Sequence, residues 1–213
     1  MCEQLSEIEY TLQCFPEMKH CAEIFDKQGL LTEKSYLAHC IYLDEDDLSV
    51  LKDRKVGIAH CPNSNFSLRS GILNTHKMLT AGMKVGLGTD VSGGYHPSVF
   101  DALRVAIHAS KALGFGKETL SYKAISHHEG FYLATLGGAQ VLSLEDKVGN
   151  FEVGKQFDAL VIDTAAPSHY PVFDTFTGES FDDILSKFLY LGDDRNIIRV
   201  FVNGQEVICK QFW

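Results

Sequence analysis

The sequence is poor in positive charge and in long apolar runs. It has 19 Lys and Arg residues against 28 Asp and Glu residues, so its formal net charge is −9, and no segment is rich in basic residues. Proteins that bind nucleic acid neutralise phosphates at several points, and a membrane-spanning helix needs roughly 18 to 20 apolar residues in a row. We therefore expect neither a nucleic-acid partner nor a membrane partner.

Several well-known motifs are also missing. The acidic N-terminus lacks the basic flank and apolar stretch of a secretory signal, and none of the six cysteines forms a C-x-x-C pair. We therefore expect a cytoplasmic protein with reduced thiols, most of them buried as small apolar residues. The sequence has no G-x-S-x-G, H-E-x-x-H or P-C-x-x-C motif, which argues against a serine hydrolase, a zincin or a cytidine-type deaminase.

What is present is a pattern of alternating strands and helices. The chain has 213 residues, 45% of them hydrophobic, which is enough to bury a core. Short apolar runs predict three strands, and amphipathic stretches between and after them predict helices. The predicted strands are 35–40, 55–61 and 83–90, with helices at 44–51, 74–81 and 98–112 and a loop at 62–65. This order is typical of a parallel α/β fold.

The two ends of the chain add further elements. Residues 3–25 predict a helix that breaks near Pro16, and 121–136 predict another helix. In the last third the strand-like runs are 157–163, 197–202 and 205–208, with Asn203-Gly204 as a hairpin turn and a long loop at 165–180. We therefore divide the chain into an α/β part, 1–145, and a β-rich segment with a terminal hairpin, 146–213.

Three polar residues stand at the carboxyl ends of the predicted strands: His39, His60 and Asp90. In a β/α barrel the catalytic groups come from these ends, so the three would share one rim. On local sequence alone Asp90 is either a functional carboxylate or a helix cap. His39 is either a catalytic or metal-facing imidazole or a hydrogen-bonded core residue. For His60 a structural role is favoured.

Longer motifs resemble a known family. The segments LAHC at 37–40, IAHCPNSN at 58–65, GLGTD at 86–90 and GNFEVGKQFDA at 149–159 resemble the C-terminal half of the amidohydrolase superfamily, in its aminohydrolase branch. The segment KFLYLGDDRNI at 187–197 narrows the resemblance to the guanine-deaminating members. The resemblance extends over nearly the whole chain.

The resemblance implies a fold and a reaction. The fold would be the last three strands and helices of a (β/α)8, TIM-like barrel, followed by a small β segment of a composite β-sandwich. The reaction would be the zinc-dependent hydrolysis of guanine to xanthine and ammonia, in a homo-oligomer. By the same resemblance Asp90 would be a metal ligand and accept a proton, Glu3 would shuttle protons, and His39 would contact the reacting water or purine. All three would touch the substrate.

The sequence also departs from the family pattern. It has no H-x-H pair and no histidine three residues before Glu3, so only one of the four family metal ligands, Asp90, is present. We expect the isolated chain to bind Zn²⁺ weakly, to be inactive alone, and to associate with another copy or a full-length subunit. Two alternatives remain open: a non-catalytic binding or scaffold derivative of the fold, and a related deaminase.

Overall fold

The computed structural model describes residues 1–115, 122–166 and 171–210. The chain forms two compact units, Met1–Glu145 and Asp146–Trp213, and each is described by itself. No helix in the described ranges is long and apolar enough to cross a membrane.

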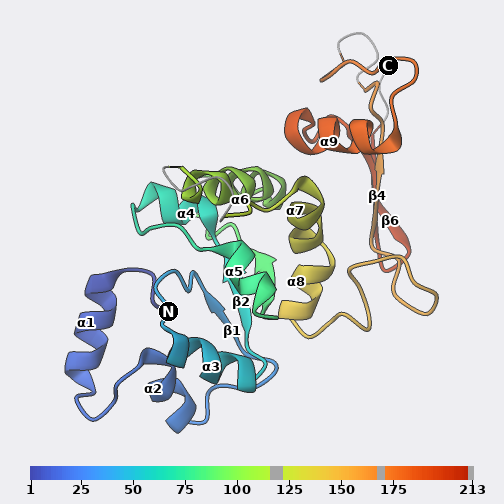
Figure 1. Ribbon diagram of the computed structural model, residues 1–213. Helices are drawn as coiled ribbons and strands as arrows, with labels where there is room; N and C mark the ends of the chain where they lie inside the picture. Colours follow the sequence, from blue (N-terminus) through green and yellow to red (C-terminus); the bar gives the residue numbers. More distant parts are fainter. Residues whose placement is uncertain (116–121, 167–170, 211–213) are drawn as a thin grey trace. The chain divides into compact units, whose positions relative to one another are not determined.

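A three-stranded parallel sheet forms the centre of the first unit. Its strands are β1 (Tyr36–Ala38), β2 (Gly57–His60) and β3 (Lys84–Leu87), in the order β1-β2-β3. Helices α3 (Glu45–Asp53) and α5 (Thr75–Thr80) connect successive strands (Figure 1). This repeat confirms the predicted parallel α/β architecture. Within the described residues β1 and β3 each have one neighbouring strand, which leaves both edges open, as expected for part of a barrel.

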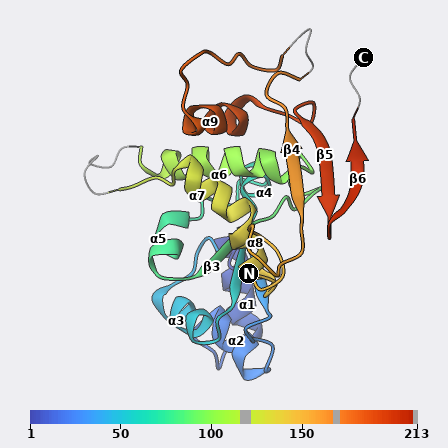
Figure 2. The same ribbon diagram turned by 90° about the vertical axis from the view of Figure 1, so that its right-hand side faces the viewer.

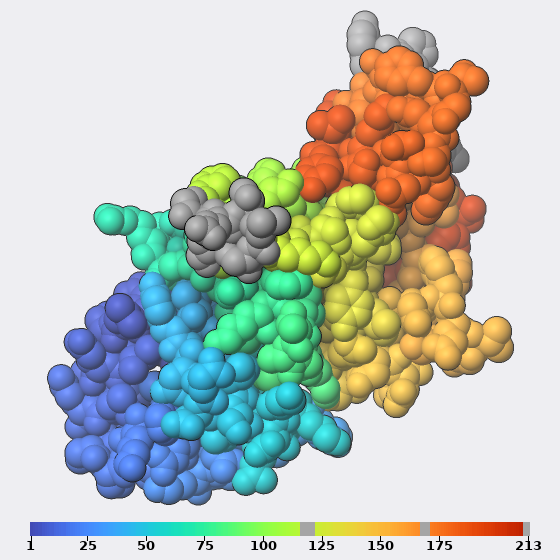
Figure 3. Space-filling view, in the orientation of Figure 1, coloured from blue at the N-terminus to red at the C-terminus, as the bar shows by residue number. Residues whose placement is uncertain are grey.

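Two short helices precede the sheet. They are α1 (Leu5–Cys14) and α2 (Cys21–Lys27), so the helix predicted over 3–25 does break around Pro16. The backbone N–H of Ala22 in α2 donates to the buried carboxylate of Asp47 in α3, at 2.7 Å. Figure 3 shows the blue N-terminal residues at the surface beside the cyan residues that include α3.

Three further helices complete this unit: α6 (Val99–Leu113), α7 (His127–Ala134) and α8 (Leu136–Val141). Helix α8 approaches the sheet closely because Gly86 and Gly137 have no side chain: a Cβ added to Gly86 in β3 would lie 2.7 Å from the Cα of Gly138, and one added to Gly137 would lie 2.6 Å from the carbonyl oxygen of Val85. Apolar side chains from the strands and helices fill the core. The largest of those that are fully buried in this unit are Leu51, Ile58, Leu73, Leu103, Ile107, Ile125 and Leu133.

Two sequence predictions were wrong in this unit. Residues 62–65 are not a loop but belong to α4 (Pro62–Ser67), in which proline occupies the first turn, where its missing N–H costs nothing. The helix predicted over 121–136 starts only at 127, while residue 121 lies outside the described residues. Its start is set by a capping box between Ser126 and Glu129, and it is interrupted at Thr135, where α7 ends and α8 begins.

The second unit is a small antiparallel sheet with one helix. The sheet order is β4-β5-β6 and the helix α9 lies beside it (Figure 2). The bounds are β4 (Ala159–Ile162), α9 (Phe181–Leu191), β5 (Ile197–Val202) and β6 (Gln205–Cys209). The hairpin is confirmed: Asn203 and Gly204 both have positive φ, 51° and 77°. Helix α9 was not predicted, although Ser180 and Asp183 form a capping box at its start.

Candidate active site

Glu3, His39 and Asp90 come together at the carboxyl end of the parallel sheet. The nitrogen Nε2 of His39 lies 3.6 Å from Oε2 of Glu3 and 3.8 Å from Oδ2 of Asp90. These separations exceed a hydrogen bond, so the groups face one another across a gap that a water molecule or a ligand atom can bridge. The exposed fraction of the side chain is 12% for His39, 21% for Glu3 and 40% for Asp90, so the gap opens to solvent on the side of Asp90.

The backbone at these positions is strained. Cys2, His39 and Asp90 all have positive φ, at 52°, 68° and 47°. Residues other than glycine rarely adopt this conformation, and it persists only where surrounding contacts enforce it, often at functional sites. The strain turns the chain sharply as it leaves β1 and as it passes Asp90.

Backbone hydrogen bonds hold Glu3 beside the end of β1. The carbonyl of Met1 accepts from the N–H of Cys40, and the carbonyl of Cys2 accepts from the N–H groups of Ile41 and Tyr42, at 3.0–3.1 Å. The Cys2 side chain is fully buried. The N-terminal residues are therefore tied to the strand end, and the carboxylate of Glu3 is brought to the imidazole of His39.

Residues of α4 and the turn after it contact two of the three side chains. Oδ1 of Asn65 lies 2.9 Å from Nδ1 of His39, and the hydroxyl of Ser70 donates to Oε1 of Glu3 at 2.5 Å. The hydroxyl of Tyr42 in turn donates to the carbonyl of Ser70 at 2.7 Å. Sequence reasoning missed Asn65 and Ser70 as part of the site. The only local signal was the run of polar residues at 63–65 just after the strand, and Ser70 had none.

The turn after Asp90 packs against α4 without room for side chains. The N–H of Gly94 donates to the carbonyl of Asp90 at 2.6 Å. A Cβ added to Gly94 would lie 2.2 Å from the carbonyl oxygen of Thr89, and one added to Gly93 would lie 2.8 Å from Oδ2 of Asp90. The two glycines thus let the backbone fold tightly over the carboxylate.

His60 does not join the other two residues at the rim. Its side chain is 1% exposed, and neither ring nitrogen has a hydrogen-bond partner in the part of the chain that the structure describes. Burial, and to a lesser extent the neighbouring His39, lower the pKa of His60 to about 3, so the ring is neutral at physiological pH. This position agrees with the structural role that the sequence favoured for His60.

The nearby thiols are not nucleophiles. Burial, together with the charge of Asp90, raises the pKa of Cys61 to about 11, and burial raises that of Cys40 to about 12. Burial also raises the pKa of Cys2. Thiols of such high pKa stay protonated and unreactive at neutral pH. Four of the six cysteines are buried and all six are free, which confirms the expected packing role for most of them.

The donors gathered here do not complete a catalytic zinc site by themselves. Catalytic zinc is normally held by three protein ligands with one position left for water. One imidazole nitrogen faces two carboxylates in this group, and the resemblance makes only Asp90 a ligand. On that expectation a zinc ion at this group would need ligands in addition to Asp90.

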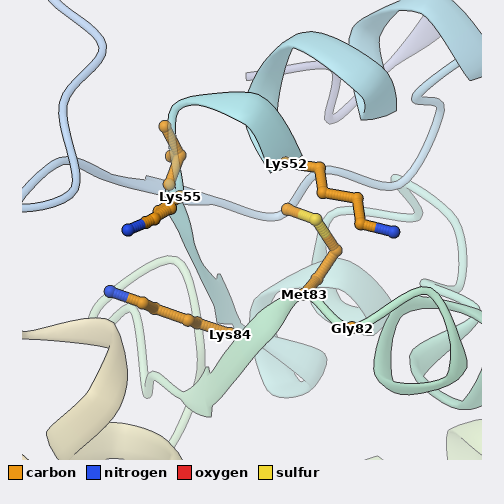
Figure 4. Close-up of a pocket in the computed structure, with 6 residues that line it drawn as sticks. Lys52, Lys55, Gly82, Met83 and Lys84 are labelled. Carbon is orange, nitrogen blue, oxygen red and sulfur yellow. The ribbon is translucent and has the colours of Figure 1, made fainter.

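A pocket at the opposite end of the strands has different chemistry. It is lined by Lys52, Lys55, Val56, Gly82, Met83 and Lys84, just where β2 and β3 begin (Figure 4). Three lysines and no carboxylate offer no acid–base pair, and catalytic groups of β/α barrels lie at the carboxyl ends of the strands. The group of Glu3, His39 and Asp90 is therefore the candidate active site.

The fold and the place of this group are those of part of an amidohydrolase-type β/α barrel, and comparison with known proteins agrees. The chain belongs to the amidohydrolase family, whose model matches residues 1–207.

Within that family the similarity is to guanine deaminases. The chain is 46% identical over 209 residues to guanine deaminase of Mus musculus, covering 97% of this chain and 45% of that protein. It is similar in structure to E. coli guanine deaminase, with a TM-score of 0.86 and 34% identity, covering 99% of this chain and 48% of the other. For guanine deaminase from C. acetobutylicum with guanine bound in its active site, the TM-score is 0.84 and the identity 35%, covering 98% and 47%. The chain thus spans about half the length of the relatives it matches.

Proposed function

We propose that this chain is the C-terminal half of a guanine deaminase, which hydrolyses guanine to xanthine and ammonia. The observation that carries the proposal is the convergence of Glu3 and Asp90 on Nε2 of His39 at the strand ends. The identity of 46% with the mouse guanine deaminase supports the choice of substrate.

The three side chains have the chemistry that hydrolytic deamination needs. Water adds to the ring carbon that carries the amino group, and its proton passes to the carboxylate of Asp90. Protonated Glu3 gives its proton to the ring nitrogen, then takes the hydroxyl proton of the tetrahedral carbon and passes it to the amino group, which leaves as ammonia. The proton on Asp90 then restores protonated Glu3, while His39 holds the water and the tetrahedral carbon in position. General acid–base catalysis of this kind contributes about 10²- to 10⁴-fold to a rate.

This chain would supply only one of the ligands of a zinc ion. A bound zinc ion makes hydroxide available at neutral pH by lowering the pKa of its water to about 7. In this chain Asp90 would hold it, and the remaining ligands would come from the half of the protein that the relatives possess in addition. We expect the isolated chain to bind zinc weakly and to be inactive.

The open sheet suggests how the missing ligands arrive. Both β1 and β3 have an unpaired edge among the described residues, and such edges favour association with further strands. We propose that the chain pairs with the other half of the fold, within a longer chain, a full-length subunit or a homodimer. Cytoplasmic localisation stays a prediction from the sequence.

A chimera tests the proposal. The part of the mouse enzyme that precedes its matched region is joined to Met1 of this chain, and the product is offered guanine, adenine, cytosine and a triazine. We expect zinc-dependent formation of xanthine and ammonia from guanine, and none from this chain alone or the mouse segment alone. A folded chimera that acts on another substrate but leaves guanine unchanged would contradict the proposal.

A further inference from the structure

The segment after β2 buries polar side chains to an unusual degree. Asn63, Ser64 and Asn65, in α4, are between 0% and 2% exposed, and Ser70 just beyond is 4% exposed. Asparagine and serine are mostly found at the surface, and buried polar groups need hydrogen-bond partners. Such burial costs stability wherever a polar atom is left without a hydrogen-bond partner.

The task of Asn65 is visible in what its amide contacts. Its oxygen Oδ1 lies 2.9 Å from Nδ1 of His39, whereas its nitrogen Nδ2 has no partner among the residues described. Within the described ranges Asn63 likewise uses only one end of its amide, so it is the partner at that end, His39 for Asn65, that distinguishes the two residues. The backbone N–H of Asn65 donates to the carbonyl of Cys61 at 3.0 Å, which fixes the residue within α4.

A neutral imidazole carries one hydrogen, and an amide oxygen within hydrogen-bond distance of one ring nitrogen favours the hydrogen on that nitrogen. Oδ1 of Asn65 can only accept, so Nδ1 of His39 must carry the hydrogen, and Nε2 is left with its lone pair. The carboxylates of Glu3 and Asp90 face Nε2 and would, on their own, favour the hydrogen there. Asn65 thus opposes the tautomer that the rest of the site prefers.

We propose that Asn65 is a positioning residue for His39: its side-chain oxygen holds the ring and keeps the hydrogen on Nδ1, so that Nε2 points into the gap as an acceptor. An acceptor at that place can take a hydrogen bond from the attacking water and aim its oxygen. This role rests on the proposed function, whereas the tautomer itself follows from the contact alone.

Nitrogen NMR of this chain tests the tautomer directly. Magic-angle-spinning spectra of protein labelled with ¹⁵N in its histidine rings distinguish protonated from unprotonated ring nitrogens, and they do so for associated as well as monomeric protein. Loss of a signal in His39→Gln assigns His39. With the His39 ring neutral, we expect its hydrogen on Nδ1 in the native chain and on Nε2 in Asn65→Leu. In Asn65→Asp the carboxylate restores the acceptor, so we expect the hydrogen on Nδ1 again.

A matched variant controls for disturbance of α4. Asn63 is equally buried in the same helix, but its amide donates to Asp101 at 2.7 Å rather than contacting His39. Asn63→Leu should therefore leave the His39 tautomer unchanged. Hydrogen on Nε2 in the native chain overturns the proposal, and so does an unchanged tautomer in a folded Asn65→Leu. If Asn65→Leu fails to fold, the native chain and Asn65→Asp still decide the question.

The catalytic consequence is measured separately in the chimera. Asn65→Leu should lower kcat for guanine about tenfold or more with little change in KM, and Asn65→Asp should recover part of the loss. If the chimera is inactive but His39 carries its hydrogen on Nδ1, the result would contradict guanine deamination and leave the contact of Asn65 with His39 as proposed. If the chimera is active and Asn65→Leu leaves its kcat unchanged, the result would contradict the positioning role of Asn65 and leave guanine deamination as proposed.

Discussion

The hydroxyl of Ser70 donates to Oε1 of Glu3 at 2.5 Å, although the two residues are 67 positions apart in the sequence. The same carboxylate presents its other oxygen, Oε2, to His39. One oxygen of Glu3 is therefore held by the protein and the other remains available at the site.

Removing this hydroxyl should impair catalysis. In the active chimera, Ser70→Ala frees the Glu3 carboxylate, and a hydrogen bond to a charged group contributes about 1.5–3 kcal/mol, so we expect kcat to fall roughly tenfold or more. Ser67→Ala, at an exposed position on α4, should have no effect. Equal rates for both variants in steady-state assays of xanthine formation would show that Ser70 does not position Glu3.

The buried imidazole of His60 should make the chain sensitive to acid. Its pKa is about 3 in the folded state and 6.5 when unfolded, so the unfolded state binds a proton between these values and the folded state does not. The contribution to stability is present above pH 6.5 and is lost as the pH falls, by about 1.4 kcal/mol per pH unit.

His60→Leu should remove this dependence. Between pH 7 and pH 5 its free energy of unfolding should decrease by about 2 kcal/mol less than that of the native chain, as measured by urea denaturation. Replacement of the exposed His108 by Gln should leave the pH dependence as it was. The same acid sensitivity in His60→Leu would mean that another group is responsible.

His20 should give the opposite pH dependence, stabilising the folded chain at low pH rather than at high pH. Its Nδ1 lies 2.7 Å from Asp44 and its Nε2 lies 3.0 Å from Asp46, and the hydrogen bond to Asp44 is the main cause of its raised pKa. The stability it contributes is full below pH 6.5 and is lost as the pH rises through the folded-state pKa. The groups are partly exposed, so we expect less than about 1 kcal/mol.

Denaturation of His20→Asn should show this contribution. The variant should be less stable than the native chain at pH 6 and equally stable at alkaline pH, and 1 M NaCl should shrink the difference at pH 6. A difference that stays constant across this pH range would indicate lost packing rather than a lost ion pair.

Gly94→Ala should disrupt the turn that covers Asp90. The added methyl group would lie 2.2 Å from the carbonyl oxygen of Thr89, so the backbone must move. We expect a loss of most deaminase activity in the chimera with the helix content retained. In contrast, Gly138→Ala places a methyl 3.6 Å from the nearest heavy atom and should keep full activity; comparable losses in both would point to general misfolding.

Much of the fold could be predicted because strands and helices differ in the period of their apolar residues. The strands around His39, His60 and Asp90 and the hairpin at Asn203-Gly204 follow such local patterns. Helix α9 was missed although its apolar residues recur at helical spacing (181, 184, 185, 188 and 189), because the region around it was interpreted as loops and strands. Helix α4 was read as a loop because its asparagines and serines are buried by tertiary contacts that no local pattern reveals.

The candidate site was predicted in part. A carboxylate and an imidazole at strand ends are visible in the sequence, and the family resemblance pointed to Glu3. Ser70 and Asn65 could not be found in this way, since their roles depend on distances to Glu3 and His39 that only the folded chain defines. The roles of all three candidate residues stay predictions until they are tested.

The central claim is that Glu3 and Asp90 carry out the proton transfers of guanine deamination. The most direct measurement is kcat for guanine in the chimera and in its Glu3→Gln and Asp90→Asn variants, with the exposed Glu9→Gln as the control. We predict that each of the two site variants loses about 10²- to 10⁴-fold in kcat and that Glu9→Gln loses nothing. Folded Glu3→Gln and Asp90→Asn variants that retain more than a tenth of the activity would contradict the account.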